Sequence, residues 1–159
     1  MGKTRASDPI GKFFARYNQF DYDPHSEAWS EYHRMCAFFN WKKDCKKERA
    51  ANTLFRDAIV AQFGCLYGVD ENKLATLQRL CEKLEVFPVP QSVTSCKKAI
   101  SKVHVNIMDF IDSERTGVPI RIFGSLSQLR RYTVDNDKIF PKRQARKSAL
   151  LRYLLRRIL

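Results

Sequence analysis

The chain has 159 residues, a formal net charge of +12 at pH 7 and a sequence pI near 9.7. This length suits one domain that buries a core without a metal or a disulfide, and six glycines and six prolines are too few for a disordered or collagen-like chain. The charge favours a polyanionic partner: nucleic acid, an anionic membrane surface or an acidic protein. A basic surface that serves solubility alone remains the alternative.

The five cysteines form no CxxC pair and are odd in number: Cys36, Cys45, Cys65, Cys81 and Cys96. The first eleven residues, MGKTRASDPIG, lack the apolar stretch of a signal peptide. We therefore expect reduced thiols in a nuclear or cytoplasmic protein. No apolar run reaches about 18 residues, so no integral membrane association is expected.

The first half of the chain predicts three helices. Two Asp-Pro pairs, Asp8-Pro9 and Asp23-Pro24, indicate helix starts, because aspartate caps a helix and proline fits its first position. Apolar residues at steps of three and four predict helices over about residues 9–17 and 24–39. The charged segment Lys42–Arg49 leads into a third predicted helix, which runs to about Tyr67. Gly68 is expected to end the third of these in a left-handed conformation.

The second half predicts four more helices and one weak hairpin. Asp70 is expected to cap a fourth helix, Ser92 a fifth that runs to about Asp112, and Ser125 a short sixth. Pro141 precedes a terminal helix. The only strand-like run is Val118–Phe123, which is expected to pair with Lys138–Phe140.

These elements predict an all-α, mostly α fold. We expect a single compact bundle of about six or seven helices with at most one small β-hairpin. Residues 1–8 are expected to be a frayed N-terminus, and residues 9–159 to form a single helical domain that ends in a basic amphipathic helix.

The C-terminal segment, residues 138–159, concentrates the charge, with eight basic residues and no acidic one. On a helical projection its leucines share one half of the wheel, which indicates a face that docks on the core or on a partner. The partner-binding candidates are Leu151, Leu155 and Ile158. The phosphate-binding candidates are Lys142, Arg143, Arg146, Lys147, Arg152, Arg156 and Arg157.

A second basic cluster follows Trp41 and contains Lys42, Lys43, Lys46 and Lys47. An indole beside lysines is suited to stack on a nucleobase while the lysines neutralise phosphates. The alternative is a solvated helix start with Trp41 folded into the core.

Catalytic and metal-binding patterns are weak. His33 and Cys36 lie one helical turn apart and Cys45 follows, but the second ligand pair of a zinc site is missing. His104 and Asp112 are expected to share a structural hydrogen bond rather than to act as acid and base. No nucleotide-binding or hydrolase motif is present. We expect no catalytic residue, no metal, no cofactor and no enzyme activity.

Several blocks of the sequence resemble a known family. They are FFARYNQFDYDP, FRDAIVAQFGCLYG, LQRLCEKL, FPVPQSV, SKVHVNIMDFID, RTGVPIRIF and LLRYLLRRIL, within Phe13–Leu159. The chain resembles a family of small, largely uncharacterised proteins of filamentous and mushroom-forming fungi. The resemblance implies one compact domain and no particular activity, and this chain is more basic than the family.

The sequence thus favours a non-enzymatic protein that associates with nucleic acid through sequence-tolerant phosphate contacts. The alternative is a protein–protein interaction module whose Leu-rich C-terminal helix docks on a partner or on a second copy of the chain.

Overall fold

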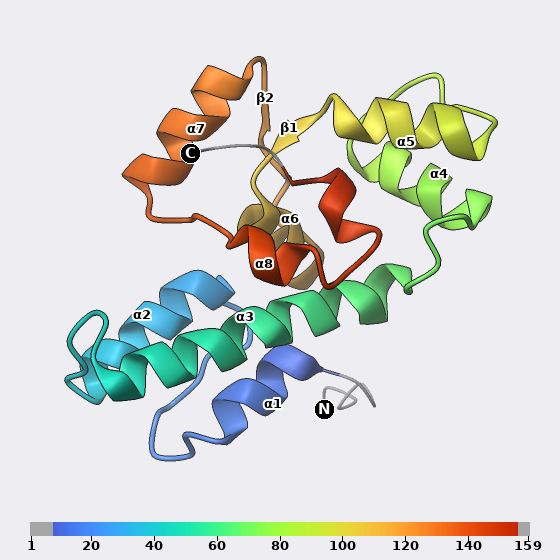
Figure 1. Ribbon diagram of the computed structural model, residues 1–159. Helices are drawn as coiled ribbons and strands as arrows, with labels where there is room; N and C mark the ends of the chain where they lie inside the picture. Colours follow the sequence, from blue (N-terminus) through green and yellow to red (C-terminus); the bar gives the residue numbers. More distant parts are fainter. Residues whose placement is uncertain (1–7, 156–159) are drawn as a thin grey trace.

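Helix α3 (Lys46–Tyr67) runs through the middle of the molecule and is its longest element (Figure 1). The structure is a computed structural model that describes residues 8–155. Helices α1 (Pro9–Ala15), α6 (Ile107–Thr116) and α8 (Lys142–Ala145) pack against α3. The aromatic core forms around Phe55 of α3, whose ring is stacked on Tyr32 with centroids 4.7 Å apart.

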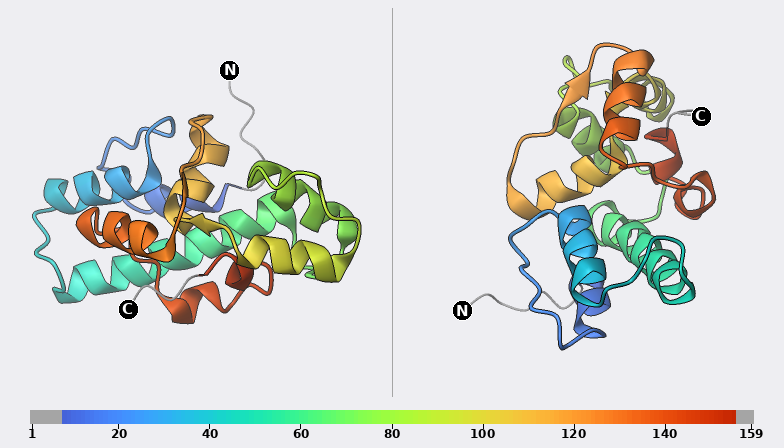
Figure 2. Two further views of the ribbon diagram at one scale, coloured as in Figure 1. Left: turned by 90° about the horizontal axis from the view of Figure 1, so that it is seen from above. Right: turned by 90° about the vertical axis from the view of Figure 1, so that its left-hand side faces the viewer.

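The other elements surround this axis. They are α2 (Ala28–Phe38), α4 (Leu74–Lys83), α5 (Val93–Ser101), α7 (Leu126–Asp135), the 3-10 turn η1 (Leu151–Tyr153), and the strands β1 (His104–Val105) and β2 (Ile122–Phe123). Helices α4 and α5 pack as a pair beyond the C-terminal end of α3, whereas α2 and the loop after it lie at the other end (Figures 1 and 2). The mostly α fold with one small hairpin is confirmed. Residues 8–155 contain eight α-helices rather than six or seven, because the expected fifth helix is split.

Three predicted helix caps are confirmed by their hydrogen bonds. The Asp8 carboxylate accepts from Gly11 N at 3.1 Å, with Pro9 as the first residue of α1. Ser92 and Ser125 accept in the same way at the starts of α5 and α7. Gly68 ends α3 with a φ of 77°. A side chain at that φ is strained, which is why glycine occupies the position.

The other two aspartates expected to cap helices do not do so. The Asp23 carboxylate accepts from His25 N and Ser26 Oγ, both at 2.9 Å, and Asp70 accepts from Asn72 N at 2.9 Å. These local turns occupy the carboxylates, so α2 and α4 begin only at Ala28 and Leu74.

The expected single helix from Ser92 to Asp112 is wrong. Helix α5 ends at Ser101, and a new helix, α6, begins after Asn106. Asn106 Oδ1 accepts from Asp109 N at 3.2 Å, while its amide donates to Thr133 Oγ1 and to the carbonyl of Lys138. Strand β1 lies between these two helices and pairs with β2. The predicted pairing of Val118–Phe123 with Lys138–Phe140 is therefore wrong.

The predicted terminal helix is also wrong within the described residues. Helix α8 ends at Ala145, and the chain turns at Ser148, whose Oγ accepts from Leu151 N at 3.1 Å. This turn allows Leu150, Leu151 and Leu154 to reach the core together, where each is 0% exposed. The burial of three leucines outweighs the continuation of a regular helix.

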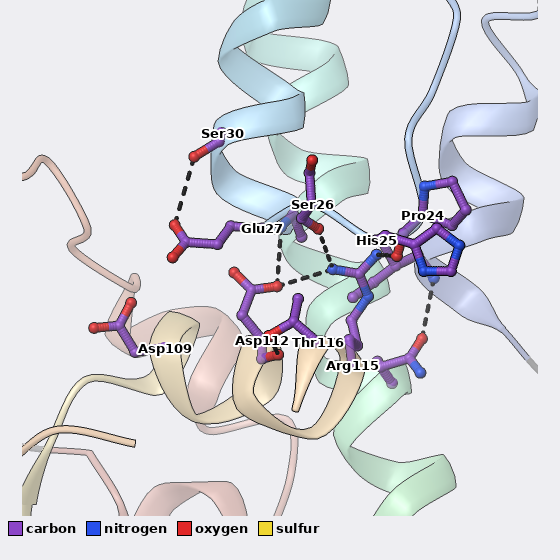
Figure 3. A network of polar contacts seen from close by, with 12 residues as sticks. Pro24, His25, Ser26, Glu27, Ser30, Asp109, Asp112, Arg115 and Thr116 are labelled. Carbon is purple, nitrogen blue, oxygen red and sulfur yellow. Dashed lines mark hydrogen bonds and ion pairs between the residues drawn. The ribbon is translucent and has the colours of Figure 1, made fainter. Parts of the chain in front are cut away.

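A buried ion pair fastens α6 to the start of α2 (Figure 3). Asp112 Oδ1 accepts from Ala28 N and from Arg115 Nη1, both at 2.9 Å. Arg115 also donates to the Tyr22 hydroxyl and to the carbonyls of Pro24 and Ser26. The expected bond between His104 and Asp112 is therefore wrong, because Asp112 is engaged by α2 and Arg115. No helix in residues 8–155 is both long and apolar enough to span a bilayer.

Candidate functional site

Helix α2, the loop after it and the first turns of α3 enclose a pocket of about 570 Å³, called here the α2–α3 pocket. Its aromatic lining consists of Trp29, Tyr32, His33 and Trp41. Trp41 is half-buried and stacks on Phe39, with centroids 5.0 Å apart and an interplanar angle of 19°. The volume is within the usual range of sites for small organic molecules.

Arg56 is the one charged residue of this lining that is buried, with 5% of its surface exposed. Its Cζ atom lies 4.5 Å from the centre of the Trp29 ring and 5.5 Å from that of Phe140. These cation–π contacts stabilise a guanidinium away from water.

The polar contacts of Arg56 are long and involve neutral acceptors. Nε donates to Asn52 Oδ1 at 3.4 Å, and Nη1 donates to Met108 Sδ at 3.6 Å. No carboxylate in residues 8–155 forms an ion pair with Arg56. Because burial penalises the charged form, the pKa of Arg56 falls to about 10, which still leaves the group charged at neutral pH.

The rim of the α2–α3 pocket carries both signs of charge. Lys43 and Arg49 are exposed basic residues, whereas Asp44, Glu48 and Asp137 are acidic. The Glu48 side chain accepts from the Tyr32 hydroxyl at 3.2 Å, and the two aspartates are exposed. Water and salt screen exposed charges more than buried ones, so the Arg56 guanidinium has the least screened charge of the lining.

The residues of the second basic cluster, Lys42, Lys43, Lys46 and Lys47, are all exposed at this end of α3. Lys46 and Lys47 occupy the first turn of α3. Lysine there is opposed by the positive end of the helix dipole, so it contributes nothing favourable to the helix. The free N–H groups and the dipole of that turn favour an anion.

Helix α8, near the start of the basic C-terminal segment, packs against α3 (Figure 1). Its basic residues and those just after it are exposed: Lys142, Arg143, Arg146 and Lys147, called here the α8 cluster. Lys147 Nζ lies 2.9 Å from Asp57 Oδ1, and Asp57 follows Arg56 in α3. At 1.5 Å per residue, the part of α3 from Lys46 to Asp57 spans about 16 Å. The two basic clusters thus lie along the same half of α3.

The remaining predicted phosphate contacts do not join this group. Arg152 is exposed, but its Nη2 lies 2.7 Å from Oε2 of Glu71, which follows the C-terminal end of α3 in the chain. Arg156 and Arg157 lie outside the described residues.

The predicted partner-binding residues need a correction. Leu151 is completely buried, so it belongs to the core rather than to a docking surface. Leu155 is half-buried and packs against the core. Ile158 lies outside the described residues.

The residues of the α2–α3 pocket do not form a metal site or an acid–base pair among the described residues. Within residues 8–155, no three His, Cys, Asp or Glu side chains converge as metal ligands, and no disulfide joins any of the five cysteines. His33 packs edge-on against Trp29, with centroids 4.4 Å apart. Burial lowers the pKa of His33, so its ring is neutral at neutral pH.

The sequence interpretation missed Arg56 and Trp29. Arg56 follows Phe55, which belongs to the buried row of α3, so helical spacing puts it at the border of the core. An arginine at such a position with no acidic residue three or four positions away was the available signal.

The comparisons with known proteins found no match: no family model, no curated protein and no solved structure resembles this chain significantly. The resemblance to small fungal proteins therefore stays a prediction.

Proposed function

We propose that this protein is a non-enzymatic nucleic-acid-binding protein, and that phosphates bind along the first half of α3. The observation that supports this proposal most is that two basic clusters about a hundred positions apart in the sequence flank the same segment of one helix. A linear polyanion is the kind of ligand that contacts both clusters at once.

The charges of this surface are available to a ligand. Within residues 8–155, no ion pair engages the following exposed residues: Lys42, Lys43, Lys46, Lys47, Lys142, Arg143 and Arg146. The pair between Lys147 and Asp57 has side chains 53% and 41% exposed, so it is weak and yields easily to phosphate. The 16 Å between Lys46 and Asp57 corresponds to about five phosphates along one strand of B-form DNA.

Binding of this kind is tolerant of sequence, because phosphate contacts carry no base information. Lysine and arginine on an exposed helix surface neutralise phosphates and release their counterions. We therefore expect DNA and RNA of unrelated sequence to bind with similar affinity.

The test compares two triple variants in a fluorescence anisotropy titration with labelled single strands and duplexes at low salt. K42Q/K46Q/K47Q and R143Q/R146Q/K147Q each remove three charges from one cluster, and each is expected to weaken binding about tenfold or more. K73Q/K98Q/K102Q removes three exposed charges from the α4–α5 end and is the matched control, with a much smaller effect.

Two results contradict the proposal. One is the absence of binding by the wild-type chain at low salt, and the other is an equal loss in all three variants. The substituted positions are exposed, so circular dichroism is expected to be unchanged. The protein-interaction alternative has no comparable support, because Leu151 is in the core.

A further inference from the structure

We infer that the α2–α3 pocket binds one nucleotide unit, with its phosphate on the Arg56 guanidinium and its base against the aromatic lining. This inference rests on the proposed function and adds a defined subsite to it. The unit is either a free nucleotide or an unstacked nucleotide of a single strand, which share the same chemistry.

The Arg56 guanidinium is buried and forms no ion pair within residues 8–155. A buried arginine almost always has an acidic partner, because an uncompensated charge is costly to remove from water. The rings of Trp29 and Phe140 lie over this guanidinium, and stacking leaves the N–H donors at its edge able to form hydrogen bonds. Two of these donors contact neutral acceptors at long range. Asp137 and Glu48 act on this charge only at longer range, because neither forms an ion pair with Arg56. A phosphate matches the remaining donors and binds the guanidinium directly.

Aromatic side chains line the pocket around that charge. A nucleobase needs a flat apolar partner, and the half-buried indole of Trp41 lies in the lining. Trp29, Tyr32 and His33 also line the pocket, and the Trp29 ring packs against both other rings. Phosphate alone leaves the aromatic surface unused, and an apolar ligand leaves the guanidinium unpaired.

The rim of the pocket is continuous with the second basic cluster. Lys43 and Arg49 belong to the rim of the pocket, and Lys46 and Lys47 follow in the same stretch of chain. A strand held on those lysines therefore passes the mouth of the pocket. The three acidic residues of the rim, Asp44, Glu48 and Asp137, oppose an anion, so neutralising the exposed Asp137 is a direct way to raise the affinity for one.

The chain offers its own reporter for the test. It contains two tryptophans, Trp29 and Trp41, and both line the pocket. Intrinsic tryptophan fluorescence of the full chain is therefore titrated with nucleoside monophosphates, with the corresponding nucleosides and with inorganic phosphate. The inference expects saturable quenching by the monophosphates, with nucleosides and phosphate at least tenfold weaker.

Two substitutions sharpen the result. R56K keeps the charge but removes the planar donor fork, and it is expected to weaken nucleotide binding at least tenfold. D137N removes an exposed negative charge at a φ of 52°, which asparagine adopts readily, and it is expected to tighten binding two- to threefold. K98Q on α5 is the control and is expected to leave the affinity unchanged. Because Asp137 is exposed, D137N tests the inference even if R56K fails to fold.

The outcomes separate the two proposals. If oligonucleotides bind in the anisotropy titration but neither they nor mononucleotides change the fluorescence, the pocket inference is wrong and the proposed function stands. If mononucleotides quench and D137N binds them more tightly while no oligonucleotide binds, the pocket takes free nucleotides and the proposed function is wrong. No quenching and no oligonucleotide binding overturns both. An unchanged nucleotide affinity in both R56K and D137N also overturns the inference, and Arg56 is then a structural cation–π partner of Trp29.

Discussion

Arg56 and Trp29 form a cation–π pair, with 4.5 Å between the guanidinium carbon and the ring centre, and no carboxylate in residues 8–155 forms an ion pair with the arginine. The cation–π contact contributes about 2 kcal/mol when it is desolvated, whereas burial of the charge costs several kcal/mol. Methionine fills a similar shape without the charge. We expect R56M to change the free energy of unfolding by no more than about 1 kcal/mol, because these two terms oppose each other.

Urea unfolding followed by circular dichroism measures the effect of R56M. F55A is the control for a purely structural neighbour, and it is expected to cost about 3–5 kcal/mol because Phe55 is completely buried. A comparable loss in R56M shows that Arg56 is part of the structural core and not a binding residue.

Leu151 provides a test of the folded C-terminal segment. Its side chain is 0% exposed, so L151A creates a cavity and is expected to lower the free energy of unfolding by about 2–5 kcal/mol. L155A is the matched substitution, and its half-buried position predicts a smaller loss. If Leu151 served only to dock on a partner, L151A would leave the urea midpoint unchanged.

The ion pair between Asp112 and Arg115 predicts strong coupling. Their side chains are 6% and 9% exposed, so D112N leaves a buried guanidinium without its charged partner. The expected loss in unfolding free energy is about 3–5 kcal/mol. R115M/D112N removes both charges and is expected to recover part of that loss, which a double-mutant cycle measures. Additive effects of the two single substitutions contradict this account.

Glu31 predicts the acid dependence of stability. Burial pushes the pKa of Glu31 upward, but hydrogen bonds from Arg34 and from the backbone N–H of Asp23 outweigh it, so the pKa lies below the ordinary value of a glutamate. A depressed carboxyl pKa stabilises the fold above the unfolded-state value, and this stabilisation disappears as the pH falls through the folded-state value. E31Q is therefore expected to lower stability at neutral pH and to flatten the loss of stability below about pH 4.5. Urea midpoints across that pH range check this, and parallel curves for wild type and E31Q speak against it.

The sequence predicts the fold well where local chemistry decides it. Asp8, Ser92 and Ser125 cap the helices that follow them, because each hydrogen bond closes within three residues. Asp23 and Asp70 look alike in the sequence, but their carboxylates close tighter turns. Where a side chain can either cap a helix or close a local turn, sequence spacing alone does not predict which hydrogen bond forms.

The two helix breaks that the sequence does not predict, after Ser101 and near Ser148, depend on long-range contacts. The break after Ser101 depends on Asn106, whose amide reaches Thr133 and Lys138, and on a strand partner at Ile122–Phe123. The helical spacing of apolar residues continues across that break and hides it. The end of the chain is similar, because the turn at Ser148 follows from the burial of leucines on a core that is assembled elsewhere.

The candidate site also has features that the sequence predicts and features that depend on long-range packing. Runs of lysine and arginine are visible in the sequence, and their exposure follows from their charge. Their position along one helix follows from the packing of α8 on α3, which no local pattern predicts. Arg56 was missed because its environment is made by Trp29 and Phe140 from other parts of the chain.

The salt dependence of nucleic-acid binding tests the central proposal most directly. The logarithm of the association constant of the wild-type chain for a labelled single strand is measured against the logarithm of the salt concentration. Each phosphate contact contributes about −0.7 to the slope, so R143Q/R146Q/K147Q is expected to flatten the slope by about 2, while K73Q/K98Q/K102Q keeps the wild-type slope. A wild-type slope near zero, or the same flattening in both variants, contradicts a phosphate-binding surface along α3.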